Sequence, residues 1–453
     1  MTAQPESPQS ANTLTFLDQI TFELLRATGR RQLMQAVWLY EHPIDLAALQ
    51  RFHEKLGHGF FARQIQQSSL PFGRPRWVRR IGPPAGIDAW HEPWPRADYM
   101  AWADEHAAMP IDPEFGPSWR LGVVPLDDGS TAVSMVISHC VADGGGGVLA
   151  VAEAVTGMGR DLGLPNPPDT RLTSLKRDVV QSLRDVPEAV RVLRSVIVER
   201  VKSRSAAGDR TPPADVAGSE SRCVAIPCVV LFVDTQQWDA CAERLGGNSY
   251  SLLAGFVAKL SEGLGRSRAS DGAVTLVIAF NDRKGLDDSR AIAMSFANAV
   301  LDPAVVTKDL SPARDAIRKA RQAALETPNQ ALDMAPLIPW LPRNAVKGIV
   351  NSLFAYSEDV PVSCSNMGEL PPIVGQIDGT DAEYLLMRGM DQNVTEREMQ
   401  RSNGQLVVVS GRINGKISIS VEAYQPRSEN SKRWLREIAQ QTLTDFGLTG
   451  VIE

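Results

Sequence analysis

The chain has 453 residues, more than the roughly 250 to 300 at which single hydrophobic cores stop growing, so we expect two domains. Hydrophobic residues make up 43% and charged residues 22%, a globular composition that excludes fibrous and disordered chains. The net charge of -6 provides no overall attraction for nucleic acid. Five cysteines, an odd number, favour a reducing cytoplasmic compartment over a disulfide framework.

The N-terminal half mixes helices and strands behind a polar segment, residues 1–12, which we interpret as a flexible tail without a signal peptide. Apolar spacing predicts a helix over 14–25, a strand over 33–39, a helix over 45–56, and strands over 119–124 and 131–137. The turn signal Asp127-Asp128-Gly129 joins the last two strands and indicates a hairpin. No apolar run approaches the roughly 18 residues that cross a bilayer.

Residues 171–204 form a long helical pattern, broken once by Pro187, with nine Lys and Arg against four acids, a net charge of +5. Apolar residues recur on one face of this basic helix. Two interpretations stay open. The helix packs by its apolar face onto its own lobe, or it contacts a membrane surface or an acidic acyl carrier protein.

Residues 205–221 are rich in Ala, Gly, Pro, Asp and Ser without an apolar period, and we interpret them as a linker. This places an N-terminal lobe at 13–204 and a C-terminal lobe at 222–453. The second half predicts a strand over 224–233, a helix over 249–264, a strand over 274–280, a hairpin of 406–410 and 417–421 around Asn414-Gly415, and a helix from 431 to Gly447. The apolar, proline-broken segment 334–354 either lines an acyl channel or forms a buried connection.

His139 is the only one of six histidines at which a buried strand enters a glycine-rich turn, Gly144 to Gly147. An imidazole at such a position can accept a proton near neutral pH. Alternatively, His139 is a hydrogen-bonded core histidine, and Asp143 only caps the helix that begins at Gly144. Asp143 can also pair with a distant cation, for which Arg283 is the candidate.

Other chemistries fit this sequence poorly. The glycine run lacks the Lys-Ser/Thr ending of a phosphate-binding Walker loop. Cys140 cannot share a site with His139 as a thiol nucleophile, because adjacent strand residues point to opposite faces. The histidines His42, His53 and His58 lack cysteine or acidic partners at zinc-ligand spacing, so we expect no metal.

Several short motifs occur in a fixed order along most of the chain, from residue 14 to residue 448. They are Pro117-Ser118-Trp119-Arg120, Ser138 to Gly144, Asn248-Ser249, Asn281-Asp282-Arg283 with the later Met294 and Asn298, and Ser365-Asn366-Met367-Gly368. In this order they resemble the CoA-dependent acyltransferase superfamily with its His-His-x-x-x-Asp-Gly motif, which includes condensation domains, polyketide-associated acyltransferases and wax ester synthase/diacylglycerol acyltransferases. Ser138, Ser118 and Ser249 replace the family's first His, Leu and Asp.

The resemblance implies an α/β (α+β) fold of two chloramphenicol-acetyltransferase-like lobes, with mixed open sheets, packed helices and an active-site tunnel between the lobes. It implies that His139 is the general base and that Asp143 braces the loop by pairing with Arg283. Backbone N–H groups of Gly144 and Gly145 would hold the oxyanion. The residues expected at the substrate are Ser138, Gly145, Trp119, Asn281, Arg283, Asn298, Ser365 and Asn366.

The expected reaction moves an acyl group from acyl-CoA to an alcohol, in lipid or wax ester metabolism, with no bound cofactor. One alternative is a condensation-type enzyme that takes its acyl group from carrier-protein phosphopantetheine and forms an amide or an ester. Another is a binding protein that kept the fold without turnover. We expect a cytoplasmic protein, and peripheral contact to the inner face of the membrane through 171–204 is one of the interpretations left open for that helix.

Overall fold

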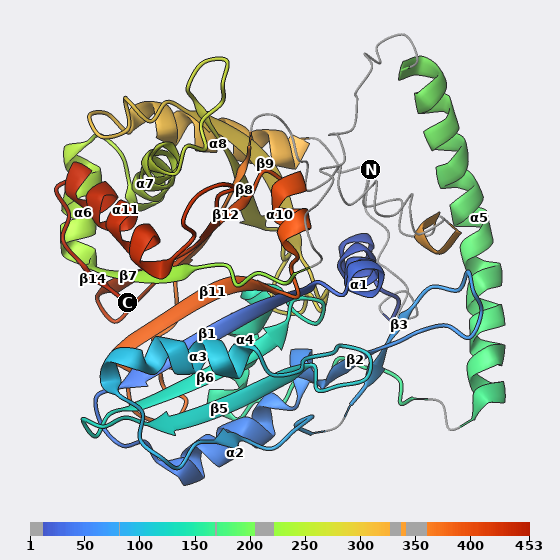
Figure 1. Ribbon diagram of the computed structural model, residues 1–453. Coiled ribbons are helices and arrows are strands. Elements are labelled where there is room, and N and C mark those ends of the chain that lie inside the picture. The colour runs from blue at the N-terminus through green and yellow to red at the C-terminus, as the bar shows by residue number, and fades with distance from the viewer. Residues whose placement is uncertain (1–11, 81, 168–169, 204–221, 327–336, 341–359) are drawn as a thin grey trace.

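The computed structural model describes residues 12–80, 82–167, 170–203, 222–326, 337–340 and 360–453, which form two lobes (Figure 1). Its helices are α1 Phe16–Thr28, α2 Leu46–Leu56, α3 Tyr99–Ala107, α4 Gly144–Thr156, α5 Arg171–Ser203, α6 Thr235–Arg244, α7 Ser249–Gly263, α8 Ser311–Glu326, α10 Glu396–Arg401 and α11 Lys432–Asp445. Short 3-10 helices are η1 Gly59–Ala62, η2 Arg96–Asp98 and η4 Pro372–Gly375.

The strands are β1 Arg31–Tyr40, β2 Arg63–Gln66, β3 Arg76–Arg79, β4 Asp88–Ala89, β5 Trp119–Pro125, β6 Thr131–Ser138, β7 Cys228–Asp234, β8 Val274–Asn281, β9 Met294–Leu301, β10 Val362–Glu369, β11 Tyr384–Gln392, β12 Gln405–Ile413, β13 Lys416–Tyr424 and β14 Val451–Ile452. They form a five-stranded sheet, a seven-stranded sheet and the small β2–β3 ribbon. The mixed α/β architecture expected from the sequence is therefore confirmed.

The five-stranded sheet has the order β11-β1-β6-β5-β4 and belongs to the N-terminal lobe. The predicted hairpin is present, because β5 and β6 pair antiparallel from Trp119–Ile137 to Pro125–Thr131. Every residue of β6 is buried, as its unbroken apolar run predicts for a central strand. The end of β6, where His139 follows, is thus set by packing on both faces of the sheet.

The seven-stranded sheet has the order β14-β7-β13-β12-β10-β8-β9. Side chains of α6, α7, α8 and α11 form one core with it, including Trp238, Phe256, Ile317 and Leu443. The hairpin β12–β13 turns at Asn414 and Gly415, both with positive φ (50° and 74°), as the Asn-Gly pair predicts. Two parallel pairings, β8 with β10 and β10 with β12, make this sheet mixed.

Strand β11 crosses from the C-terminal half of the sequence into the N-terminal sheet, where it pairs antiparallel along β1. The division into 13–204 and 222–453 therefore separates the two sheets except for this strand. Apolar residues of both halves meet beside it, since Val37, Val230 and Leu386 share one core cluster. Alternation along a strand indicates which face is buried but not which strand is its neighbour, so the sequence did not predict this exchange.

Two predicted boundaries also differ. Helix α5 runs through Pro187 without a break, although proline removes one main-chain hydrogen bond. Strand β7 begins at Cys228 instead of residue 224, because Pro227 has no N–H group for a strand ladder. The tail up to residue 11, the linker 205–221 and most of the segment 334–354 lie outside the described residues.

Candidate active site

His139 lies directly after β6, and its main-chain N–H donates to the Gln32 carbonyl at 2.9 Å. Its side chain is partly buried, and the Nδ1 atom is buried without a hydrogen-bond partner among the described residues. Buried polar atoms in native proteins are nearly always paired. His139 is therefore not the satisfied core histidine of the alternative interpretation, and its ring keeps hydrogen-bonding capacity for another molecule.

Asp143 both caps α4 and pairs with Arg283. Its Oδ1 accepts from the Gly146 N–H at 2.6 Å and from Arg283 Nη2 at 2.9 Å, so the predicted pair is present. Its Oδ2 accepts from the Ala293 N–H at 2.6 Å, and the carboxylate is 2% exposed. Because the hydrogen bonds found for this carboxylate in the described part of the chain go elsewhere, Asp143 does not orient the His139 ring directly.

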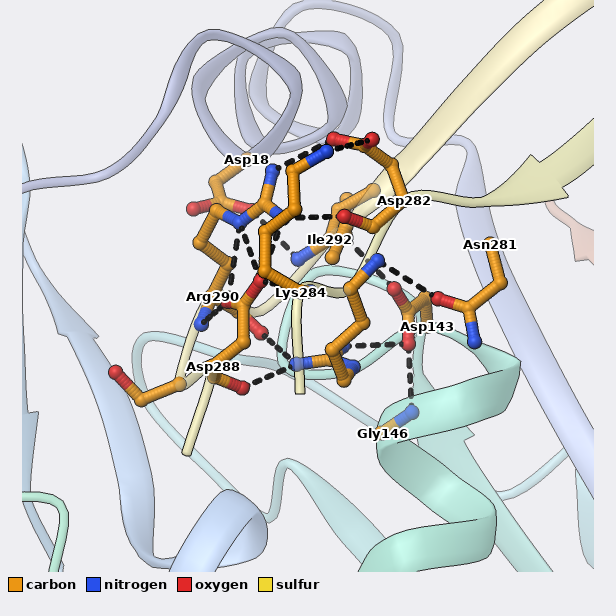
Figure 2. A network of polar contacts seen from close by, with 12 residues as sticks. Asp18, Asp143, Gly146, Asn281, Asp282, Lys284, Asp288, Arg290 and Ile292 are labelled. Carbon is orange, nitrogen blue, oxygen red and sulfur yellow. Dashed lines mark hydrogen bonds and ion pairs between the residues drawn. The ribbon is translucent and has the colours of Figure 1, made fainter. Parts of the chain in front are cut away.

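Residues 282–293, between β8 and β9, form a segment that we call the crossing loop, because it belongs to the C-terminal sheet and contacts the N-terminal lobe. The Asp143 N–H donates to the Ala291 carbonyl at 2.9 Å. Asp18, in the first turn of α1, accepts from the Ile292 N–H at 3.1 Å. Arg63 donates to the Ser289 carbonyl at 2.8 Å. Figure 2 shows Asp18, Asp143 and Ile292 in this network, which connects the two lobes beside His139.

The crossing loop is also held by its own charges. Asp288 pairs with Arg290 at 2.6 Å, and Asp282 pairs with Lys284 at 2.7 Å and with Arg290 at 3.2 Å (Figure 2). Burial opposes ionisation of Asp288, but hydrogen bonds from Arg290 and main-chain N–H groups outweigh it and lower its pKa. Arg283 Nη1 donates to the carbonyls of Asp288 and Arg290. The Arg283 guanidinium is thus held by two carbonyls of the crossing loop in addition to its pair with Asp143.

Two fully buried charged groups flank this network. Burial raises the pKa of the Asp18 carboxyl, although hydrogen bonds from Thr15 and the charge of Arg63 act in the opposite direction. Burial lowers the pKa of Arg63 to about 10, partly offset by Asp18. The Arg63 guanidinium also lies over the rings of Phe60 and Trp77, at 5.1 and 5.2 Å from the centroids. Asp18 and Arg63 thus join the N-terminal lobe to the crossing loop.

The N-terminus of α4 faces the ends of two parallel strands. Ser365 in β10 pairs with Ala279 in β8, so Asn281 at the end of β8 and Met367 near the end of β10 lie toward the same sheet edge. A Cβ on Gly144 would come within 2.8 Å of the Met367 thioether, and one on Gly145 within 3.5 Å of Asn281 Nδ2. Glycine at these positions allows the close approach.

The first N–H groups of α4 divide into two pairs. Gly146 and Gly147 donate to the Asp143 side chain and main-chain carbonyl, respectively. For the N–H groups of Gly144 and Gly145, no acceptor is found within the described segments. Unpaired N–H groups at a helix start carry partial positive charge and favour an anion. The expected oxyanion donors are therefore free to act.

The remaining site residues of the sequence lie at varying distances from this centre. Ser138 is buried, and its Oγ accepts from the Cys140 N–H at 3.4 Å, so it shapes the turn that presents His139. Asn366 is partly exposed, and its Oδ1 accepts from the Gly368 N–H at 2.9 Å, where β10 leaves its regular register. Asn281 and Arg283 thus lie at the α4 N-terminus, whereas Ser365 and Asn366 lie on β10 next to Met367, which contacts Gly144.

Trp119 and Asn298, which were also expected at the substrate, lie elsewhere in the described structure. Trp119 is fully buried, and its Nε1 donates to the Phe61 carbonyl at 3.3 Å, so it packs the N-terminal core. Asn298 is exposed on the edge strand β9, where it pairs with Val277, four residues from the end at Asn281. At about 3.4 Å per residue, that places it roughly 14 Å along the strand.

Cys140 is buried, and burial raises the pKa of its thiol to about 12. A thiol with such a pKa stays protonated near neutral pH, which agrees with the sequence-based view that it is a core residue. Within the described ranges, no group of three or more His, Cys, Asp or Glu side chains could hold a metal ion. No described helix is both long and apolar enough to cross a membrane.

Sequence reasoning missed three residues of this junction. Met367 was quoted only as part of a motif, although its thioether contacts the α4 N-terminus. Asp18 follows Thr15 in a capping box, a local signal that indicates the start of α1 but not its second contact at Ile292. Arg63 gives no signal, because a buried arginine cannot be distinguished by sequence from an exposed one.

Neither a protein-family model nor a curated protein sequence matches the chain. Solved structures do match over nearly its full length, each at 14% sequence identity. The first condensation domain of the calcium-dependent antibiotic synthetase has a TM-score of 0.56 and covers 96% of this chain and 95% of its own. The wax ester synthase/diacylglycerol acyltransferase from Marinobacter aquaeolei VT8 has a TM-score of 0.54 and covers 96% and 98%.

A third match is the starter condensation domain of rhizomide synthetase, a double variant in complex with C8-CoA and Leu-SNAC. Its TM-score is 0.53, and the alignment covers 99% of this chain and 100% of that domain. The chain thus has the two-lobed fold that condensation domains share with wax ester synthases. This is the fold that the sequence resemblance implied.

Proposed function

We propose that the chain is an acyltransferase in which His139 acts as general base. The observation that carries the proposal is the partly buried His139 imidazole next to the start of α4: among the described residues, neither its Nδ1 nor the N–H groups of Gly144 and Gly145 have a hydrogen-bond partner. A base and a pair of oxyanion donors on either side of one loop are the parts that acyl transfer requires. The shared fold supports the same reaction class.

The proposed reaction begins when the His139 imidazole takes the proton of an acceptor hydroxyl. The acceptor oxygen attacks the thioester carbonyl carbon, and a C–O bond forms. The carbonyl oxygen becomes an oxyanion, which accepts hydrogen bonds from the N–H groups of Gly144 and Gly145. When the C–S bond breaks, the imidazolium returns its proton to the leaving thiolate, so His139 ends each cycle neutral.

Asp143 serves as a positioning residue in this scheme. Its carboxylate is saturated by Gly146, Arg283 and Ala293, and it fixes both the helix start and the crossing loop. Keeping these groups in place before the reaction avoids reorganisation when charge develops. Asn281, Ser365 and Asn366, at the opposite strand ends, are proposed to contact the substrates. The tunnel between the lobes also stays a prediction.

For the donor we propose acyl-CoA, and for the acceptor an alcohol in lipid or wax ester metabolism. The rhizomide starter domain, solved with C8-CoA, supports a CoA thioester in this fold. The likeness to a wax ester synthase supports an alcohol acceptor. The likeness to condensation domains favours a second candidate, in which the donor is carrier-bound and the acceptor is an amine.

The test is an assay of thiol release with acyl-CoA donors of graded chain length and a panel of alcohols and amines. We expect alcohol-dependent CoA release and a loss of roughly 10²- to 10⁴-fold in His139→Ala. The exposed His91 offers a matched control, and His91→Ala is expected to keep full activity. Equal rates in His139→Ala and the parent would contradict the proposal. Transfer only from a carrier-loaded donor to an amine would establish the second candidate.

A further inference from the structure

Helix α5, Arg171–Ser203, lies along one side of the molecule, apart from the helices that cover the C-terminal sheet (Figure 1). The structure describes its side chains at 171–187, 190 and 191. These side chains divide into three groups by position around the helix: polar ones toward the lobe, apolar ones toward solvent, and exposed cations on the two flanks between them.

The side chains that attach α5 to the N-terminal lobe are polar. Asp178 is 2% exposed, accepts from the Ser69 N–H at 2.7 Å and pairs with Arg76 at 2.7 Å. Seven residues further along the helix, about two turns, the buried Asp185 lies 3.7 Å from Arg74. The two acids of α5 whose side chains the structure describes therefore face the protein.

The apolar side chains of α5 are exposed. They follow the spacing of one helix face, and we call them the apolar stripe: Leu172, Leu175, Val179, Leu183, Val186 and Val190. Leu172 and Leu183 are 72% and 68% exposed. For the described side chains, the expectation that α5 packs by its apolar face onto its own lobe is therefore wrong.

Helix α8 shows the ordinary arrangement in the same molecule. It buries Ala313, Ile317 and Ala320 against the C-terminal core and leaves its charged side chains in solvent. Helix α5 is oriented the other way, with its described apolar side chains in solvent and Asp178 and Asp185 against the lobe. An exposed apolar row of this length, spanning 19 residues and about 27 Å of helix, is typical of an interaction surface.

Charge decides which partner fits this surface. Arg171, Lys176, Arg177 and Arg191 are exposed, whereas the acids Asp178 and Asp185 are buried and lie beside arginines of the lobe. The surface is thus cationic as well as apolar. A second copy of α5 would bring like charges together, which opposes pairing through this face. Anionic lipid headgroups above an apolar phase match both properties.

An aromatic pair lies close to the same attachment. Phe72 and Trp340 stack with ring centroids 4.9 Å apart, and both side chains are more than a third exposed. Phe72 belongs to the loop whose Ser69 binds Asp178. Aromatic residues are enriched where proteins meet the headgroup region of a bilayer. Their position gives α5 a neighbouring anchor.

We propose that α5 binds the surface of anionic membranes. Its apolar stripe enters the boundary between headgroups and acyl chains, and its exposed cations contact the headgroups. The polar attachment through Asp178 and Asp185 holds the helix on the lobe while the stripe stays available. This proposal does not depend on the catalytic role of His139.

Vesicle flotation of the full chain tests the proposal, with phosphatidylcholine vesicles compared with vesicles of equal parts phosphatidylcholine and phosphatidylglycerol. We expect binding to the anionic vesicles that weakens with salt, and much weaker binding to neutral ones. Leu172→Gln with Leu183→Gln should abolish most binding. Lys176→Gln with Arg177→Gln should weaken binding about fivefold for each cation removed. Each substitution is at an exposed position, so folding should be unaffected.

The surface of α8 provides the matched control, because Leu325 and Lys319 are exposed there. Leu325→Gln with Lys319→Gln should bind like the parent chain. Equal binding of the α5 and α8 variants to anionic vesicles would overturn the proposal, as would no binding by the parent. Binding to an acidic acyl carrier protein without vesicle binding would overturn it in favour of a protein partner. A dimer that dissociates in the Leu172→Gln, Leu183→Gln variant would indicate a second copy instead.

Discussion

Two histidines lie at the same central strand, β6, and they differ in their burial and in their hydrogen-bond partners. His106 is fully buried, with Nδ1 2.8 Å from Ser134 Oγ and Nε2 3.3 Å from Asp88. His139, at the end of the strand, is partly buried, and its Nδ1 has no partner among the residues described. Ser134, His106 and Asp88 have the composition of a catalytic triad, whereas His139 has no carboxylate of its own.

The difference shows that a triad-like set of residues is not sufficient for a site. Ser134 Oγ accepts from the Gln35 amide at 2.7 Å, and Asp88 pairs with Arg120 at 2.6 Å, so the hydrogen-bonding capacity of the set is used within the core. A Cβ on Gly122 would come within 2.8 Å of the His106 ring, which indicates how closely the ring is enclosed. The histidine with capacity to spare is the better candidate for chemistry.

The largest expected effect is a difference in activity between two variants: His139→Gln should lose acyl transfer, and His106→Gln should keep it. His139→Gln should lower kcat/KM for acyl transfer by roughly 10²- to 10⁴-fold, because it removes the proton acceptor, and should leave the denaturant midpoint unchanged. His106→Gln should leave kcat/KM of the folded protein unchanged. Steady-state kinetics and urea unfolding on both variants measure the two outcomes. Loss of activity in folded His106→Gln would break the comparison.

The next effect concerns Asp143, which neighbours His139 without contacting it. Asp143→Ala leaves the Arg283 charge buried without its partner and removes the cap of α4, so we expect a loss of about 3 to 5 kcal/mol of unfolding free energy. Asp143→Asn keeps the helix cap and should therefore lose less unfolding free energy than Asp143→Ala. Urea unfolding measures both values.

Asp45 is the matched control for Asp143, because it also caps a helix, α2, but is exposed. Asp45→Ala should cost about 1 kcal/mol. If Asp143→Ala were no more destabilising than this control, the crossing loop would not depend on the buried pair. The pH profile of kcat in Asp143→Asn should match that of the parent, since the hydrogen bonds described for the Asp143 carboxylate go to Gly146, Arg283 and Ala293 and not to His139.

A smaller loss of stability is expected from His106→Gln itself. The substitution removes hydrogen bonds at Ser134 and Asp88 in a closed core, which should lower the free energy of unfolding by about 1 to 3 kcal/mol. His91→Gln, at an exposed histidine, is the control and should have no measurable effect. Equal midpoints for the two variants would show that the buried set contributes nothing.

The smallest effect is the contribution of Asp88 to the pH dependence of the unfolding free energy in acid. Burial opposes its ionisation, but hydrogen bonds from His106 and Arg120 outweigh it and lower the pKa to about 2, from 3.8. Because the folded pKa is depressed, the carboxylate stabilises the fold above pH 3.8, and this contribution is lost as the pH falls through about 2. Asp88→Asn should therefore show a shallower fall of unfolding free energy over this window. An unchanged slope would contradict the assignment.

The sequence predicted the candidate site better than its surroundings. A buried apolar run followed by glycines was enough to find the strand, loop and helix around His139, because each is a local pattern. Arg283 was a candidate partner of Asp143, and the family resemblance implied the pair, whereas an ion pair over 140 residues leaves no local signal. The core packing of Trp119 was not predicted, because a tryptophan near a motif looks the same in sequence whether it packs a core or contacts a substrate.

The orientation of α5 shows the same limit. Periodicity identified its apolar face, but which face meets the lobe is decided by Arg74 and Arg76, which lie far away in the sequence and bind Asp185 and Asp178. A helix covered by polar partners on one side has the same sequence period as one buried by its apolar side.

Strand β11 has a consequence for the order in which the protein is made. Until residue 392 has left the ribosome, β1 has an open edge, because its neighbour on that side is encoded more than 340 residues later. An open strand edge can pair with another nascent chain, and such partly folded states are prone to aggregate. The N-terminal lobe therefore completes its sheet only after most of the chain has been synthesised.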